Sequence, residues 1–149
     1  MAEAQSSRTI REATVADARA VRELYGFGDV EEFAARLADP DTAPGTTHYV
    51  AESDSETVAV FALTALGRLR PGGRDRLMLH EIKLRPSVRG AGVAEDILAW
   101  LEKSRAVGAE RELLALAPLG QRPASFDLFG LAESHQAFKW AVVEGDRRT

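Results

Sequence analysis

The chain has 149 residues, 45% of them hydrophobic, and a formal net charge of -4 at pH 7. This length and composition predict one globular domain over residues 1–149 with a sizeable core. The chain contains no cysteine, which excludes a disulfide framework and a thiolate metal site, and no apolar run is long enough to span a membrane.

The charge and the N-terminus narrow the classes of protein further. A net negative charge argues against a nucleic-acid-binding surface and leaves room for a cationic substrate. Residues 1–7 lack the apolar core of a signal peptide and include Glu3. We therefore expect a cytoplasmic protein that binds neither nucleic acid nor membrane.

The first forty residues predict a strand and two helices. A short strand covers 9–13, and Thr14 with Asp17 three residues later is typical of a helix start. Apolar residues then recur at helical spacing up to a glycine break. A second helix begins at Asp29 and ends before Pro40.

Two strands follow, over 46–53 and 57–65, on either side of the turn residues Asp54-Ser55-Glu56. Apolar residues alternate in both. A short turn between alternating strands predicts an antiparallel hairpin.

The stretch from Leu79 to Leu116 predicts a central βαβ unit. An apolar strand stops at Pro86, a turn with two glycines follows, and an amphipathic helix runs to Gly108 before the strand 112–117. The buried side of this helix is expected to carry four residues: Val93, Ile97, Leu98 and Leu101.

The glycine turn is the first candidate site. The amides from Gly90 to Ala94 lie where a helix starts, so several donors can face one anion, and a phosphate-bearing ligand fits them. The alternative is a tight connection without a ligand. The turn is neither the dinucleotide fingerprint, because position 95 is Glu, nor the phosphate loop.

This turn resembles the pyrophosphate signature of the GNAT N-acetyltransferase superfamily, Arg/Gln-x-x-Gly-x-Gly/Ala, with Arg89, Gly92 and Ala94 in the defined places. Leu84-Arg85-Pro86 looks like the Val-x-Pro that closes the family's fourth strand. The resemblance implies a mixed central β-sheet with helices on both sides. It also implies acetyl-CoA as co-substrate, with its pyrophosphate held by Arg89, Gly90, Ala91, Gly92, Val93 and Ala94.

The strand before Pro86 carries the candidate catalytic residues. Strict alternation places His80, Ile82 and Leu84 on one face and Glu81, Lys83 and Arg85 on the other. Amine acetylation requires a neutral amine, so a base must remove the ammonium proton, and Glu81 and His80 are the candidates. Both can face one cleft only if the strand has a bulge, as the family often has.

The resemblance also implies how the rest of the cofactor binds. In the GNAT fold the strand after the helix splays from the preceding one, and the pantetheine arm lies between them. The main-chain groups of Ile82, Lys83 and Leu84 would hold this arm and polarise the thioester carbonyl.

The C-terminal third departs from the family. The segment 125–131 looks like Leu-Tyr-x-x-x-Gly-Phe, with Phe126 in the cofactor-contacting position where a tyrosine often protonates the coenzyme A thiolate. Phenylalanine cannot donate a proton, which leaves water, Ser125 or His135. The apolar run 137–143 is expected to close the sheet.

A basic loop, 67–76, contains four arginines. It is either a lip that meets the 3′-phosphate of coenzyme A or a nucleic acid, or a solvated hairpin loop. Charge runs usually form solvated surface, which favours the second interpretation.

Two functions remain open, beside a weaker third in which the glycine turn binds some other phosphorylated ligand and coenzyme A does not compete. One is an acetyl-CoA-dependent N-acetyltransferase in which a primary amine attacks the thioester directly. The other is a catalytically silent acyl-CoA-binding or interaction module with the same fold, which the missing tyrosine favours. The sequence does not name the acceptor amine, and because strand-mediated dimers occur in the family, a homodimer is compatible with either function.

Overall fold

The computed structural model describes residues 8–67, 75–88, 92–104, 111–117 and 124–139. Its strands are β1 (Thr9–Glu12), β2 (Thr46–Ser53), β3 (Glu56–Leu66), β4 (Asp75–Leu84) and β5 (Arg111–Ala115). Its helices are α1 (Ala18–Tyr25), α2 (Val30–Ala38), α3 (Val93–Lys103) and α4 (Ala124–Leu128), with 3-10 turns at Val15–Asp17, Pro40–Thr42 and Pro86–Val88.

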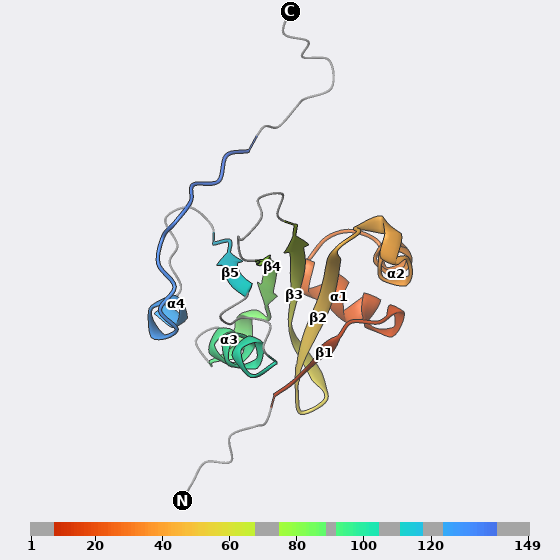
Figure 1. The fold of residues 1–149 in the computed structure, drawn as a ribbon. Helices are drawn as coiled ribbons and strands as arrows, with labels where there is room; N and C mark the ends of the chain where they lie inside the picture. The colour runs from red at the N-terminus through yellow and green to blue at the C-terminus, as the bar shows by residue number, and fades with distance from the viewer. Residues whose placement is uncertain (1–7, 68–74, 89–91, 105–110, 118–123, 140–149) are drawn as a thin grey trace, which may run out of the picture.

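The strands form one mixed sheet in the order β1-β2-β3-β4-β5. The pairs β1–β2, β2–β3 and β3–β4 are antiparallel. The strand β5 runs parallel to β4, after the crossover through α3. Helices α1 and α2 cover one face of the sheet, and α3 covers the other, with α4 beyond it (Figure 1). The mixed sheet with helices on both sides and the central βαβ unit are confirmed.

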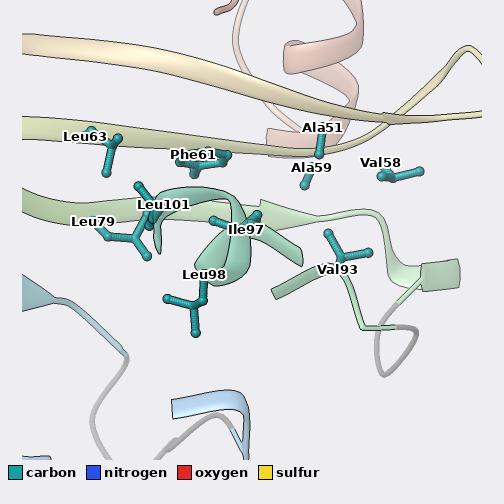
Figure 2. Close-up of a cluster of buried hydrophobic side chains, with 10 residues drawn as sticks. All are labelled: Ala51, Val58, Ala59, Phe61, Leu63, Leu79, Val93, Ile97, Leu98 and Leu101. Atoms are coloured by element: carbon teal, nitrogen blue, oxygen red, sulfur yellow. The ribbon is translucent and has the colours of Figure 1, made fainter. Parts of the chain in front are cut away.

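The core on the α3 face follows from the helical spacing of the sequence. The buried residues of α3 are Val93, Ile97, Leu98 and Leu101, as predicted. Phe61 of β3 and Leu79 of β4 point toward them from the sheet (Figure 2). Each fully buried aliphatic side chain stabilises the fold by about 1.5–3 kcal/mol relative to an exposed one, so this stripe fixes α3 on the sheet.

A buried carboxylate fixes the start of α1. Asp17 is buried, and its two oxygens accept hydrogen bonds from the guanidinium of Arg11 at 2.8 Å each. The backbone amide of Thr14 donates to the same carboxylate at 2.7 Å. Arg11 holds the pKa of Asp17 below its ordinary value. The predicted Thr14 and Asp17 helix start therefore has an additional partner on β1.

The strand β4 contains a β-bulge at Glu81. Val60 of β3 pairs with Lys83 and Ala62 pairs with His80, so two residues of β4 lie opposite Phe61. Glu81 has a φ of 53°, in the left-handed region that residues other than glycine rarely adopt.

The bulge overturns the strict alternation expected along β4. The extra residue shifts the phase, so Leu79 before the bulge and Ile82 and Leu84 after it all pack on the α3 side. Ile82 and Leu84 therefore do not share a face with His80. The bulge that the resemblance allowed is present.

The end of the chain also differs from expectation. Residues 137–139 of the run 137–143 form neither helix nor strand, and Phe138 is 88% exposed. The remaining four residues of that run lie beyond the described part. No helix within the described ranges is both long and apolar enough to cross a membrane.

Candidate functional site

The strands β4 and β5 pair over only half the length of β4. Their register runs from Asp75 opposite Arg111 to Leu79 opposite Ala115. The last hydrogen bond joins the Leu116 amide to the Leu79 carbonyl at 3.0 Å. Beyond it, β4 continues to Leu84 without pairing to any residue of β5. The backbone on this side of β4 is therefore placed to bond an extended ligand.

The predicted cofactor residues Ile82, Lys83 and Leu84 form this part of β4. Lys83 and Leu84 pair with β3 along one edge of β4, so the backbone groups at its other edge face the side of β5. We call this stretch, where β4 continues past the end of β5, the fork; it is where the resemblance predicts the pantetheine arm.

The helix α3 begins at Val93, which belongs to the core cluster against which Ile82 and Leu84 of the fork pack. Gly92 is its N-cap, with a φ of +80°, and its carbonyl accepts a hydrogen bond from the Asp96 amide at 3.0 Å. Val93 and Ala94 form the first turn, where backbone amides have no helical partner. A Cβ at Gly92 would lie 3.3 Å from a carboxylate oxygen of Glu95. Glycine is thus favoured at this position by its φ and by its close neighbour.

The other members of the predicted pyrophosphate site, Arg89, Gly90 and Ala91, lie outside the described residues. The same holds for seven residues of the basic loop, 68–74. Arg76, at the end of that loop, forms an ion pair with Glu112 of β5 at 2.9 Å.

The two candidate bases lie on the face covered by α1 and α2. Glu81 is exposed, and one of its carboxylate oxygens accepts a hydrogen bond from the hydroxyl of Tyr25 at 2.9 Å. Burial and the neighbouring Glu81 carboxylate raise the pKa of the Tyr25 hydroxyl, so it remains a neutral donor. Glu81 is therefore a solvent-accessible carboxylate with a fixed hydrogen-bond donor.

His80 belongs to a chain of polar groups on the same face. Its Nε2 lies 2.6 Å from the hydroxyl oxygen of Thr64, which in turn lies 2.7 Å from the hydroxyl oxygen of Thr46. These contacts hold the imidazole in place. They also provide a path of exchangeable protons along the sheet.

A second histidine, His48, lies on the same face of the sheet as His80, two strands away. Ala62 of β3 pairs with His48 of β2 on one side and with His80 of β4 on the other. Burial lowers the pKa of His48; Glu81 opposes this effect, and His80 adds to it. His48 is therefore predominantly neutral near pH 7.

Sequence reasoning missed Tyr25, His48 and Thr64. Each has a polar side chain next to Glu81 or His80, yet each comes from a segment that the motif does not include. The only signal in the sequence is indirect: once the hairpin register is known, His48 shares a face with the residues of β4.

Phe126 lies on α4 and packs against the core cluster of the α3 face. The Leu131 amide donates to its carbonyl at 2.8 Å. Of the alternative proton donors, His135 is exposed, and its Nδ1 lies 2.7 Å from the Ser134 hydroxyl. No contact of His135 with Glu81 or His80 occurs within the described part.

Two hollows open on the α3 face, with volumes of about 720 Å³ and 370 Å³. The larger touches the predicted site only at Gly92, and the smaller does not touch it. Neither includes His80 or Glu81. Neither lining includes Ile82, Lys83 or Leu84, so the candidate site rests on the backbone of β4 and the first turn of α3 and not on either hollow.

No family model and no curated protein matches the sequence. Solved structures do match. An acetyltransferase from Trypanosoma brucei has a TM-score of 0.72 at 19% identity, over 91% of this chain and 100% of its own. A predicted acetyltransferase with acetyl-CoA from Clostridium acetobutylicum has a TM-score of 0.62 at 14% identity, over 95% and 100%.

A protein described as a transcriptional regulator from Bacillus halodurans is also similar, with a TM-score of 0.71 at 18% identity, over 91% of this chain and 100% of its own. Such low identities establish the fold and do not carry an activity across. The order of the strands, the crossover helix and these matches agree: the chain has the fold of the GNAT acetyltransferases.

Proposed function

We propose that this chain is an acetyl-CoA-dependent N-acetyltransferase that acetylates a primary amine. One observation carries the proposal: β4 continues to Leu84 after its pairing with β5 ends at Leu79, and Ile82 and Leu84 pack on the same core cluster as Val93 at the glycine-capped start of α3. A fork next to unpaired helical amides can hold an extended arm and a phosphate together, as acyl-CoA requires.

The cofactor is assigned to two groups of residues. The main-chain groups of Ile82, Lys83 and Leu84 hold the pantetheine arm and direct a donor at the thioester oxygen. The amides of Gly92, Val93 and Ala94, together with Arg89, Gly90 and Ala91, hold the pyrophosphate. Phe126 contributes an apolar contact near the thiol.

The reaction is a direct transfer. The amine nitrogen forms a bond to the thioester carbon, the carbon–sulfur bond breaks, and coenzyme A leaves as a thiolate that takes a proton from water. Glu81 accepts the proton lost by the amine, directly or through water, with His80 as the alternative base. The exposure of Glu81 on the face opposite α3 supports this assignment.

A second function is favoured by Phe126. Its phenyl ring packs on the core and has no proton to donate, as expected for a module that binds acyl-CoA without turning it over. Binding with thiol release on addition of pooled amines supports the transferase. Binding without release on any pool supports the silent module.

The test of the cofactor site is calorimetric titration with acetyl-CoA. Gly92→Glu adds a carboxylate among the amides assigned to the pyrophosphate, and we expect affinity to fall by at least about tenfold, because like charge repels the phosphate. Gly45→Glu is the matched control, since Gly45 has the same φ of +80° and lies in the turn before β2. Unchanged affinity in Gly92→Glu would overturn the assignment.

A further inference from the structure

Tyr25 connects α1 to the bulge of β4. It is the last residue of α1, before Gly26, whose φ of 80° ends the helix. Its hydroxyl donates to a Glu81 oxygen 2.9 Å away. The contact joins residues 56 positions apart, so it is a product of the fold rather than of local chain geometry.

The aromatic ring of Tyr25 is held on several sides. It stacks on Phe33 of α2 with ring centroids 5.4 Å apart and an interplanar angle of 27°. Phe27 meets it edge-on at 6.1 Å, and the ammonium of Lys83 lies 5.7 Å from its centroid. A ring fixed by these contacts points its hydroxyl in one direction.

Glu81 is the residue that this hydroxyl reaches. A glutamate side chain ordinarily samples many rotamers when it is exposed, which works against a defined proton acceptor. Here the backbone is also in the left-handed region, which is unfavourable for a residue with a Cβ. Glu81 keeps this conformation in the folded chain, and its carboxylate receives a hydrogen bond from the hydroxyl of Tyr25.

We propose that Tyr25 is a positioning residue whose hydroxyl holds the Glu81 carboxylate in one orientation, with its other oxygen available to the acceptor amine or to a bridging water. The catalytic part of this inference rests on the proposed function. Tyr25 itself takes no proton and touches no reacting atom. Its effect passes entirely through Glu81.

A merely structural anchor between α1 and β4 would leave the chemical step unchanged. A positioning residue instead lowers kcat while the KM for acetyl-CoA stays constant, because the cofactor contacts are on other groups. The two roles are thus separable by kinetics. Tyr25→Phe is the suitable change, since it removes the hydroxyl and keeps the ring contacts with Phe33 and Lys83.

The kinetic experiment compares Tyr25→Phe with Tyr49→Phe, which changes the only other tyrosine. Tyr49 packs on Phe61 and Trp100 on the α3 side, with ring centroids 5.4 and 5.1 Å away. We expect kcat to fall roughly tenfold in Tyr25→Phe, with the KM for acetyl-CoA within about twofold. Equal kcat in the two variants would overturn the inference.

A second measurement does not depend on activity. In the Tyr49→Phe background, Tyr25 is the sole tyrosine, and its ring Cζ carbon can be labelled and observed by NMR. We expect Glu81→Gln to displace this signal, because the acceptor of the hydroxyl changes from carboxylate to amide. An unmoved signal would overturn the inference even in an active enzyme. Failure of the wild-type chain to bind acetyl-CoA would instead overturn the proposed function and leave this result standing.

Discussion

Glu81 and its neighbours show how single residues acquire chemistry from their surroundings. The carboxylate is accessible and anchored by Tyr25, whereas His80 is held within a chain of hydroxyls. His48 lies on the same face, on β2, and is half-buried. Three titratable side chains thus share one face, and Glu81 and His80 act in opposite directions on the pKa of His48.

At this scale we predict that His48 makes stability depend on pH. Burial lowers its pKa in the folded chain, so the unfolded chain binds a proton more readily once the pH falls below the ordinary value of 6.5. The free energy of unfolding should therefore decrease as the pH falls from about 7.5 to 5, and His48→Gln should flatten this decrease. Urea unfolding at several pH values measures both.

The control for this prediction is His135→Gln. His135 is exposed, so the variant should keep the pH dependence of the wild type. A His48→Gln variant whose stability varies with pH as strongly as that of the wild type would contradict the prediction.

Elements are positioned by stripes of apolar residues and by a few buried polar contacts. The stripe of α3 packs on the same core cluster as Ile82 and Leu84, which fixes the first turn of the helix relative to the end of β4. The Arg11 and Asp17 pair does the same for α1, which carries Tyr25 at its other end.

At the scale of the element, we predict that Leu101→Ala lowers the free energy of unfolding by about 2–5 kcal/mol, because it removes a side chain that is only 1% exposed and leaves a cavity. Leu128→Ala, at a leucine that is 72% exposed, should cost less than about 0.5 kcal/mol. Chemical denaturation of both variants provides the comparison. Similar losses in the two variants would mean that α3 does not pack on the sheet as described.

At the scale of the whole molecule, the residues assigned to the cofactor and the candidate bases lie on different faces of the sheet. The α3 face and the fork carry the cofactor assignment, and the face under α1 and α2 carries the candidate bases. The strand β4 lies between them and contributes to both. Under the proposed function, acetyl-CoA and the amine therefore approach β4 from different sides of the sheet.

For the whole molecule, we predict linkage between ligand binding and stability. Acetyl-CoA at a hundred times its dissociation constant should raise the free energy of unfolding by about 2.7 kcal/mol, because it binds only the folded chain. At the same acetyl-CoA concentration, the increase should fall to about 1.4 kcal/mol or less in Gly92→Glu, as a tenfold or larger loss of affinity implies, and persist in Gly45→Glu. Denaturation with and without acetyl-CoA measures it, and the absence of any increase in the wild-type chain would contradict the prediction.

The sequence predicts those features that depend on local periodicity. The apolar spacing of α3, the hairpin of β2 and β3, and the Thr14 and Asp17 helix start are all present in the structure. The phosphate-facing role of Gly92 stays a prediction.

The features that sequence reasoning missed depend on contacts distant in the chain. Hydrophobic periodicity does not locate the bulge, for which only the family resemblance allowed, because a single extra residue looks like ordinary variation. The approach of His48 to His80 depends on the register of three strands. The run 137–143 has strand composition, but composition gives no partner, and its first three residues form no strand.

The bulge in β4 adds a residue without changing the faces of the strand around it. If Glu81 were deleted, Ile82 alone would lie opposite Phe61, and Lys83 would still pair with Val60. Ile82 and Leu84 would therefore remain on the α3 side, and alternation would be regular from His80 onward. What the extra residue contributes to β4 is a position within reach of Tyr25, and not the phase of the strand.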